Sequence, residues 1–556
     1  MSAAQNQYSI GLDKTSANYV PLTPLSFLAR SAAVYPDHVS AVYEGRSFTW
    51  KQTYERCKRF ASYLAGHGIG HGDTVAAMLP NIPAMNELHF AVPMTGAVLN
   101  ALNIRLDAAS IAFQLDHGGA RIILVDPEFA GVIAEALTLM EGPKPFVIDV
   151  DDAAFSGGKR IGAIEYEAAV AAGDPAFAER PPADEWNAIA LSYTSGTTGN
   201  PKGVYFTHRQ LVLHTMSMAT TMGGLDSIRL LGNDDVYMPI TPMFHVHAWG
   251  VPYVATLLGV KQVYPGRYEP AMLVKLIKSE GVTFTHGVPT ILQMLLNAAA
   301  AAKVDLHGLK MVIGGSALPK ALAKQALEAG IDIFAGYGMS ETGPLAAVSH
   351  VSSRDLSGDP AGEVEFRTRA GIAGPLVELR IVDPDMKDIP HDGKSAGEIV
   401  LRAPWLTQGY YNNPEGSEQL WAGGYLHTSD IAVISPGGHV HITDRIKDVI
   451  KTGGEWVSSL QIEDLISQCA GVAEAAVIGV KDEKWGERPL ALVVKKPSGA
   501  DSLTDASIKE HLKQFADQGV ISKYGIPGTI MFIDSIPKTS VGKINKKELR
   551  EQYGDM

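Results

Sequence analysis

Short apolar runs alternate with longer amphipathic stretches along the first three quarters of the chain. The pattern is clearest between residues 73 and 125, and it returns between residues 235 and 334. Short strands separated by helices form βαβ units, so each stretch predicts one parallel sheet. The first sheet is expected to use strands at 74–78, 98–102 and 121–125, with helices at 83–95 and 108–117. The second is expected to use strands at 236–239, 262–264, 283–285, 311–313 and 331–334, with helices at 270–280 and 320–329.

The pattern changes after Gly374. Short β-like runs at 379–382 and 398–401 lie between Asp, Pro and Gly turns without long helices, which is typical of a small antiparallel sheet. A further β stretch spans residues 431–442, and a new αβ pattern begins after Arg445 and continues to the end.

These patterns predict an α/β fold with two domains. A single hydrophobic core rarely exceeds about 250–300 residues, and the chain has 556. We expect a large N-terminal domain over 1–446, built from two parallel αβ sheet subdomains and a small β subdomain. A smaller α+β C-terminal domain is expected over 447–556.

Composition and charge argue against several classes of protein. The net charge of −13 disfavours a nucleic-acid partner, which requires a basic face, although one local site can still be positive. Cys57 and Cys469 lie too far apart for a metal motif and indicate a reducing compartment. Residues 1–19 lack a secretion signal, and the apolar stretch 246–260 is too short to span a bilayer. We therefore expect a cytoplasmic protein without a transmembrane segment.

The segment 191–204 combines hydroxyl residues and glycines with one lysine, Lys202. Glycines let backbone N–H groups approach phosphate oxygens, the hydroxyls donate hydrogen bonds, and the lysine adds positive charge. The spacing differs from that of a Walker A loop, which disfavours a P-loop NTPase. A flexible Ser/Gly linker is the alternative, but linkers rarely lie between strand-forming runs. The segment therefore predicts a phosphate-binding loop.

The order Ser-Gly-Thr-Thr-Gly-x-Pro-Lys-Gly at 195–203 resembles the phosphate loop of the adenylate-forming superfamily. This superfamily includes acyl-CoA synthetases, peptide-synthetase adenylation domains and beetle luciferases. Segments 337–342, 425–430, 444–448 and 537–543 resemble four further motifs of the superfamily, in the expected order. Five matching segments in one order are not a chance arrangement.

The resemblance implies an ATP site. Glu341 is expected to bind the Mg²⁺ that bridges the ATP phosphates, with Thr194 as a second metal contact. Ser340 keeps a hydroxyl for the α-phosphate, and Tyr337 is expected to pack along adenine, opposite residues 315–317. The expected nucleotide-binding residues are Thr194, Ser195, Gly196, Thr197, Thr198, Lys202, Gly315, Ser316, Ala317, Gly336, Tyr337, Gly338, Ser340, Asp430, Arg445 and Lys543.

Two of these residues are expected to contact the ribose. The resemblance implies that Asp430 accepts hydrogen bonds from the ribose hydroxyls and that Arg445 lies beside it. A buried structural aspartate is the alternative for Asp430. The chain departs from the usual motif here, because Ser429 replaces a glycine and Tyr425 replaces a tryptophan.

Lys543 is the expected catalytic residue of adenylation, together with Glu341 and His245. Attack of a carboxylate on the α-phosphate brings two anions together, and a lysine between them neutralises the charge that accumulates. The alternative is a solvated charge on a basic tail. The resemblance also implies that a mobile C-terminal domain rotates about Lys447 and brings a coenzyme A site into place. The expected coenzyme A residues, which a plain β-turn also explains, are Lys451, Gly453, Gly454, Glu455 and Trp456.

The segment 242–250 is expected to line an acyl pocket, with His245 near the carboxylate and Trp249 similar to the gate tryptophan of fatty acyl-CoA synthetases. Small residues at 335 and 336 are expected to leave depth for a chain. The expected pocket residues are His245, Trp249, Val288, Phe334, Ala335 and Gly336. No Lys or Arg lies in these segments, so a substrate with a second carboxylate is disfavoured. His247 is read equally well as a pocket residue or as a packed histidine.

The resemblance therefore predicts an AMP-forming acyl-CoA synthetase that uses ATP, Mg²⁺ and coenzyme A. A medium- or long-chain fatty acid is the expected substrate, with a short-chain or methylmercaptopropionate-type acid as the alternative. A carrier-protein acceptor is disfavoured because no carrier domain follows Lys543. A luciferase-like oxygenase and a non-catalytic nucleotide-binding scaffold remain as alternatives from other classes. Homodimers are frequent in the fatty acyl subgroup, so a homodimer is also an expectation.

Overall fold

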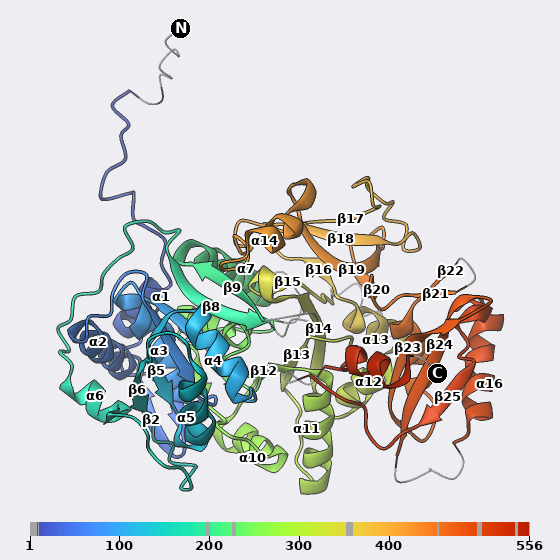
Figure 1. Cartoon of the computed structure of the whole chain (residues 1–556), viewed down its shortest axis with the longest axis horizontal. Helices are drawn as coiled ribbons and strands as arrows, with labels where there is room; N and C mark the ends of the chain where they lie inside the picture. The colour runs from blue at the N-terminus through green and yellow to red at the C-terminus, as the bar shows by residue number, and fades with distance from the viewer. Residues whose placement is uncertain are drawn as a thin grey trace.

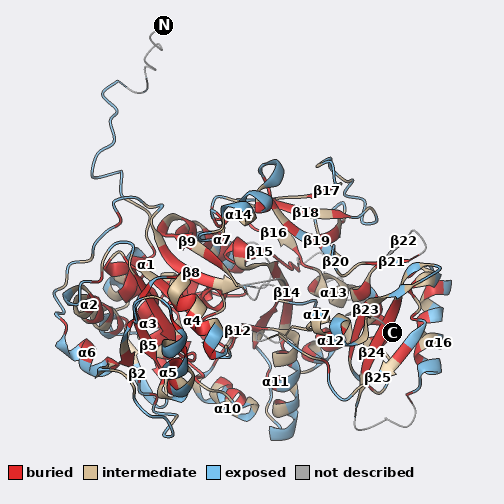
Figure 2. Ribbon diagram, in the orientation of Figure 1, coloured by how far each residue is buried: buried red, intermediate tan, exposed pale blue. Residues whose placement is uncertain are grey.

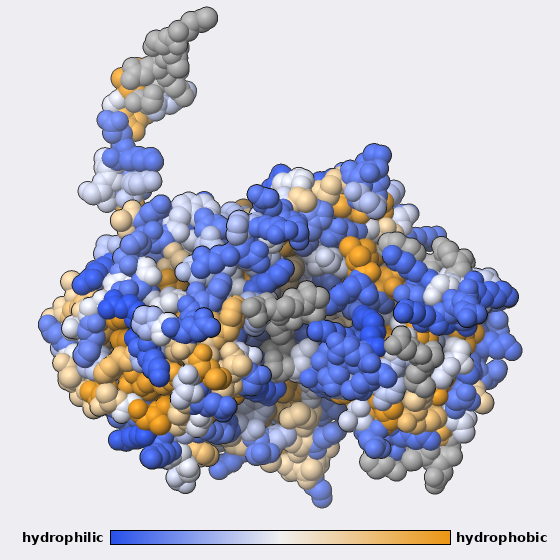
Figure 3. All heavy atoms as spheres, viewed as in Figure 1, coloured by the Kyte–Doolittle hydropathy of each residue, from blue (hydrophilic) through white to orange (hydrophobic). Residues whose placement is uncertain are grey.

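The computed structural model describes residue 8 and residues 10–194, 201–224, 229–351, 360–452, 455–496, 503–539 and 543–554, with backbone alone at 360–361 and 455–456. A large body carries a smaller C-terminal domain at one side (Figure 1). Residues 10–20 form an exposed arm without helix or strand that projects from this body (Figures 1 and 3). Tyr19 and Val20 are exposed in this arm although they are apolar.

The first sheet has seven strands in the order β7-β6-β5-β3-β4-β8-β9. All neighbours are parallel except β8 and β9, which form an antiparallel pair. The expected strands at 74–78, 98–102 and 121–125 are its centre, which confirms a parallel αβ subdomain. The strands are β3 (Thr74–Met78), β4 (Val98–Ala101), β5 (Ala120–Val125), β6 (Phe146–Asp149), β7 (Ile164–Glu165), β8 (Ala188–Thr194) and β9 (Lys202–Thr207). The helices of this part are α1 (Leu25–Val34), α2 (Trp50–Gly66), α3 (Pro83–Met94), α4 (Ala108–His117), α5 (Ala130–Leu139) and α6 (Tyr166–Ala172).

The second sheet has nine strands in the order β16-β15-β14-β13-β12-β10-β11-β1-β2, and its six inner strands from β14 to β1 are parallel. Two strands from the beginning of the chain, which the local pattern did not predict, complete one edge. The strands are β1 (Val39–Tyr43), β2 (Arg46–Thr49), β10 (Val236–Pro239), β11 (Lys261–Val263), β12 (Phe284–Gly287), β13 (Lys310–Ile313), β14 (Asp332–Gly338), β15 (Leu345–Val348) and β16 (Ile372–Ala373). The helices are α7 (His208–Gly224), α8 (Val246–Trp249), α9 (Val251–Leu258), α10 (Pro270–Glu280), α11 (Pro289–Ala302), α12 (Lys320–Glu328) and α13 (Pro360–Thr368).

Separate hydrophobic cores cover the two faces of this second sheet. Successive side chains of a strand point to opposite faces, and β14 follows this rule. Ile333 and Ala335 belong to one core, whereas Phe334 belongs to the other. Figure 2 shows buried residues concentrated in the strands, with exposed residues on the outer faces of the helices.

The small β subdomain is a four-stranded antiparallel sheet, as expected, in the order β17-β18-β19-β20. The C-terminal domain has a five-stranded sheet in which β24 pairs with β21, β23 and β25. Their elements are β17 (Glu378–Val382), β18 (Gly397–Arg402), α14 (Pro414–Leu420), β19 (Leu426–Ile434), β20 (Val440–Arg445), β21 (Ile450–Thr452), β22 (Glu455–Val457), α15 (Ser459–Ser467), β23 (Val472–Asp482), β24 (Gly486–Lys495), α16 (Asp505–Asp517), β25 (Thr529–Phe532) and α17 (Lys546–Tyr553). Within the described ranges, no helix combines the length and apolar character that a bilayer crossing requires.

Candidate active site

The carboxyl ends of three neighbouring parallel strands place several of the expected residues. Val288 follows β12, Gly315 follows β13, and Gly336 lies near the end of β14. These strands are adjacent in the sheet. Since ligands of open α/β sheets bind beyond the carboxyl ends of the strands, this edge is the candidate site.

The C-terminal domain brings Lys543 to this edge. The N–H of Thr539 donates to the carbonyl of Lys543 at 2.7 Å, and the N–H of Lys543 donates to Oγ1 of Thr539 at 3.2 Å, so these two contacts fix the backbone of the lysine. A Cβ built on Gly315 lies 3.2 Å from Cε of Lys543 and 3.3 Å from Cγ1 of Val288. The φ of Gly315 is +79°, which also favours glycine. Gly315 therefore leaves the space that the lysine side chain occupies.

The electrostatics of the site show which groups surround Lys543. Burial, with the nearby positive charge of Arg445, lowers the pKa of Lys543 to about 8, although Asp430 and Glu341 act in the opposite direction. Burial and the charge of Lys543 together lower the pKa of His245 to about 3. His245 is therefore neutral near pH 7. The structure thus brings together five expected residues that are far apart in sequence.

Asp430 is held by two donors. The hydroxyl of Tyr337 donates to Oδ2 of Asp430 at 2.8 Å, and Nε of Arg445 donates to Oδ1 at 3.1 Å. Tyr337 is only 9% exposed, so its ring is largely packed in the core and offers little surface to adenine. Each oxygen of Asp430 keeps a lone pair for a further donor such as a ribose hydroxyl.

The substitution of glycine by Ser429 has a visible backbone consequence. Ser429 has φ +59°, a left-handed conformation that glycine adopts more easily than other residues. Its N–H donates to Oε1 of Glu398 at 3.0 Å. The positive φ at this position explains why glycine is the usual residue, and Ser429 adopts the same conformation at a cost.

Glu341 lies in a short 3₁₀ turn over Ser340–Thr342 and is 6% exposed. Its Oε1 accepts a hydrogen bond from the hydroxyl of Tyr410 at 2.7 Å. The ammonium of Lys202 lies 4.5 Å from the centre of the Tyr410 ring. The sequence analysis did not single out Tyr410, because two adjacent tyrosines in a loop carry no recognised spacing.

The phosphate loop and the coenzyme A loop are described only at their ends. Thr194 at the end of β8 pairs with Lys202 at the start of β9. Lys451 pairs with Trp456 in the antiparallel pair of β21 and β22. The expected residues Ser195, Gly196, Thr197, Thr198, Gly453 and Gly454 lie outside the described residues. The side chains of Glu455 and Trp456 are likewise not described, and Ser316 and Ala317 are exposed on the loop after Gly315.

The segment expected to line the acyl pocket has a left-handed backbone. Val246, His247, Ala248, Trp249 and Gly250 have φ between +45° and +72°. L-residues lose roughly 1–2 kcal/mol each in a left-handed helical turn, so surrounding contacts must hold this one. The turn places the Trp249 ring 4.8 Å from that of His286 and 3.0 Å from a Cβ built on Gly314. His247 is buried beside His89, with ring centres 4.8 Å apart, as a packed histidine.

Neighbouring side chains pack closely around Ala335 and Gly336, where depth for an acyl chain is expected. Ala335 is buried in the core on the opposite face of the sheet from Phe334 and Trp249. A Cβ on Gly336 lies 3.0 Å from Val312 and 3.2 Å from Leu345, so neighbouring side chains already fill that space. Phe334 and Ala335 therefore face opposite sides of the sheet and do not form one wall.

The residues on either side of Lys447 form hydrogen bonds with different parts of the chain. The N–H of Ile446 donates to the carbonyl of Ser429 at 2.9 Å, which fixes it to the small β subdomain. Arg550 of α17 donates to Asp448 at 3.0 Å and to the carbonyl of Lys447 at 3.3 Å. Lys447 thus lies between a backbone contact to the small β subdomain and contacts to α17.

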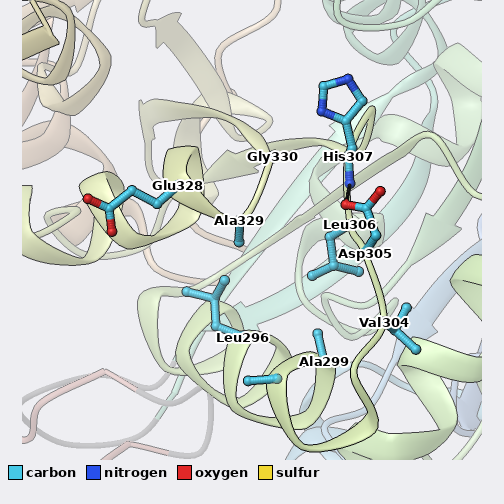
Figure 4. A pocket seen from close by; sticks show the side chains of 10 residues that line it. Leu296, Ala299, Val304, Asp305, Leu306, His307, Glu328, Ala329 and Gly330 are labelled. Atoms are coloured by element: carbon cyan, nitrogen blue, oxygen red, sulfur yellow. Dashed lines mark hydrogen bonds between the residues drawn. The ribbon is translucent and has the colours of Figure 1, made fainter.

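A separate hollow of about 350 Å³ lies between the carboxyl ends of α11 and α12 (Figure 4). These ends precede β13 and β14, so the hollow is at the opposite edge of the sheet from Lys543. Its lining includes Leu296, Val304, Asp305, His307 and Glu328. It contains none of the expected site residues.

Two family models match separate parts of the chain. Residues 28–411 match the model of the AMP-binding enzyme family, and residues 461–543 match its C-terminal domain. A long-chain-fatty-acid–CoA ligase of Thermus thermophilus is 39% identical over 534 residues, which cover 95% of each chain. A peroxisomal acetate/butyrate–CoA ligase of Arabidopsis thaliana is 37% identical over 561 residues, which cover 98% of this chain and 97% of that one.

A solved anthranilate–CoA ligase in complex with anthranoyl-AMP superposes with a TM-score of 0.84 at 23% identity, covering 97% of this chain and 99% of its own. That likeness shows that the folds agree. The family models and the curated relatives cover both domains of the chain. The chain therefore belongs to the family of AMP-binding enzymes and is an acid–thiol ligase that forms acyl-CoA.

Proposed function

We propose that this ligase activates a hydrophobic monocarboxylic acid, with a medium- or long-chain fatty acid as the preferred class. ATP and the acid give acyl-AMP and pyrophosphate, and the acyl group then passes to the thiol of coenzyme A. The observation that carries the proposal is the position of Lys543 over Gly315, among Glu341, Asp430 and Arg445. The ammonium of Lys543, from the C-terminal domain, lies near these charged groups at the carboxyl ends of the strands, where a nucleotide is expected to bind.

In the first half-reaction, a carboxylate oxygen of the acid attacks the α-phosphorus, and the bond to pyrophosphate breaks. Lys543 lies where it can neutralise the charge on the phosphoryl oxygens, and such preorganised charge is often the largest catalytic contribution. Asp430, held by Tyr337 and Arg445, offers acceptor oxygens to the ribose. His245 is neutral and approaches the acid without adding charge.

Glu341 fits a magnesium ligand, because its carboxylate is buried beside the end of the phosphate loop. Mg²⁺ prefers one or two carboxylates together with substrate phosphates and water. Within the described ranges, no group of three or more His, Cys, Asp or Glu side chains forms a metal cluster, which agrees with such an open site. When bound, Mg²⁺ would supply positive charge to the phosphate oxygens, and Glu341 would hold it with Thr194 nearby.

For the second half-reaction, we propose that the C-terminal domain rotates about Lys447. The rotation would move Lys543 out of the active site and bring the loop at 451–456 to face it. The change of backbone attachment at Lys447 supports this hinge. Hinge residues absorb such rotations at a few backbone angles. The domain boundary between 446 and 447 is part of the same proposal.

The apolar surroundings of Trp249 and Phe334 support a hydrophobic acid. The curated relatives act on acids as different as acetate and long-chain fatty acids, so a short-chain or methylmercaptopropionate-type acid is the second candidate. Each buried CH₂ contributes only about 0.8 kcal/mol, so chain length is decided by packing.

The test is AMP release from ATP and Mg²⁺ with a panel of acids: acetate, butyrate, octanoate, palmitate, methylmercaptopropionate and benzoate. We expect AMP release that requires both the acid and coenzyme A, with octanoate or palmitate giving the highest kcat/KM. The Lys543→Ala variant is the negative control. A preference for acetate or benzoate would refute the proposed acid class, and pyrophosphate formation without coenzyme A-dependent turnover would refute the acceptor.

A further inference from the structure

We propose that Tyr410 is a positioning residue for adenylation, because it holds the carboxylate of Glu341 and the ammonium of Lys202 apart at the phosphate site. The inference rests on the proposed function. The Tyr410 hydroxyl is 2.7 Å from Oε1 of Glu341, and the Lys202 ammonium is 4.5 Å from the ring centre. One side chain therefore touches both the expected metal ligand and the expected phosphate-binding cation.

The backbone around Tyr410 is fixed to both partners. Tyr410 forms an isolated β-bridge with Val204, and the N–H of Tyr411 donates to the carbonyl of Gly203 at 2.7 Å, so the loop is attached to the strand that carries Lys202. The N–H of Thr407 donates to the carbonyl of Glu341 at 3.0 Å. Because three segments are joined at this point, the Tyr410 ring has a defined position relative to both charges.

The chemistry of the phenol suits this role. The Tyr410 hydroxyl donates its hydrogen bond to Oε1 of Glu341. A donor on Oε1 leaves the second carboxylate oxygen for a cation. The ring face attracts the Lys202 ammonium through its negative quadrupole.

Without the ring, Lys202 and Glu341 are opposite charges on neighbouring segments and are able to pair. In the part of the chain that the structure describes, no ion pair joins them. A direct pair would neutralise the cation that phosphate needs and the carboxylate that Mg²⁺ needs. Tyr410 satisfies each group separately, so both remain available to the nucleotide.

The test compares Tyr410→Phe, which keeps the ring and loses the hydroxyl, with Tyr410→Leu, which loses both. Tyr411→Phe is the matched control, since it is the neighbouring tyrosine. Two quantities are measured: the Kd of ATP with and without Mg²⁺ by calorimetry, and the Mn²⁺ affinity of the enzyme–ATP complex by electron paramagnetic resonance. Circular dichroism and urea unfolding establish that each variant folds.

We expect Tyr410→Phe to weaken Mn²⁺ binding about tenfold, as is typical when a partner of a metal ligand is lost, with unchanged binding of metal-free ATP. Tyr410→Leu is expected to weaken metal-free ATP binding as well, because Lys202 loses its ring. A folded Tyr410→Phe variant with wild-type Mn²⁺ affinity would overturn the inference, as would an equal loss in Tyr411→Phe. Absence of MgATP binding by the wild-type enzyme would instead refute the proposed function.

Discussion

Adenylation is expected to lose activity as the pH rises through about 8, because Lys543 must be protonated to neutralise the phosphoryl charge. The pKa of this lysine is lowered from its ordinary value of 10.5 to about 8 by burial and by Arg445. A lysine with a lowered pKa loses its charged form at a lower pH. The loss thus begins in a range where an ordinary lysine is still fully charged.

The magnitude follows from the protonated fraction. With a pKa near 8, about 0.9 of the lysine is charged at pH 7 and about 0.1 at pH 9, so kcat/KM for ATP falls about tenfold between these values. An unshifted lysine changes by only a few per cent over the same range. The assay is pyrophosphate exchange into ATP at saturating acid without coenzyme A, since the coenzyme A thiol also titrates in this range.

The Lys543→Arg variant is the control. A guanidinium stays protonated throughout this range, so its profile is expected to be flat between about pH 7 and 9 even though its absolute rate is lower. A wild-type profile that stays flat above pH 9 would refute the reasoning, because Lys543 would then be solvated or unnecessary for adenylation. An equal fall in Lys543→Arg would assign the titration to another group.

Four further outcomes are expected. Lys543→Ala should abolish pyrophosphate exchange but spare acyl transfer from supplied acyl-AMP to coenzyme A, and equal loss of both would contradict its role. Lys447→Pro should slow acyl transfer more than adenylation, measured as the two separate half-reactions, because proline restricts the proposed hinge. Gly315→Ala should lower the adenylation rate, because its Cβ meets Lys543 at 3.2 Å and its φ is +79°. Arg267→Ala should lower the free energy of unfolding in urea by about 3–5 kcal/mol, because Arg267 is the ion-pair partner of two carboxylates that are 0% exposed, whereas Arg160→Ala, at an exposed pair, should change it by less than about 1 kcal/mol.

The local sequence pattern predicted the bounds of an element correctly where clear turn residues lie at its ends. The strands at 74–78 and 236–239 and the helix at 270–280 have the predicted bounds, because apolar runs there end at Pro, Gly or Asp. Strand β1 was not predicted, since its neighbour β11 lies more than 200 residues further along the chain. Pairing at such separation depends on tertiary contacts that no local window contains.

The candidate site shows the same limit. Residues within the matched motifs, such as Glu341 and Asp430, could be named from the resemblance to the superfamily. The contact of Tyr410 with Glu341 spans 69 positions, and the backbone conformation of Trp249 depends on the packing around it. The packing of Val312 and Leu345 beside Gly336 likewise could not be predicted from the local sequence.

The left-handed turn at 246–250 restricts which amino acids can evolve in the segment proposed to line the acyl pocket. Glycine, and to a lesser degree asparagine and aspartate, accept positive φ at low cost, whereas a β-branched residue such as Val246 does not. Glycine at a neighbouring position would relieve part of the cost of positive φ in this turn. A library that varies Trp249 and also offers glycine at its neighbours is therefore expected to change the shape of the proposed acyl pocket with fewer folding failures than one that varies Trp249 alone. The backbone conformation of the turn thus limits which amino acids can be accepted there, independently of selection for a substrate.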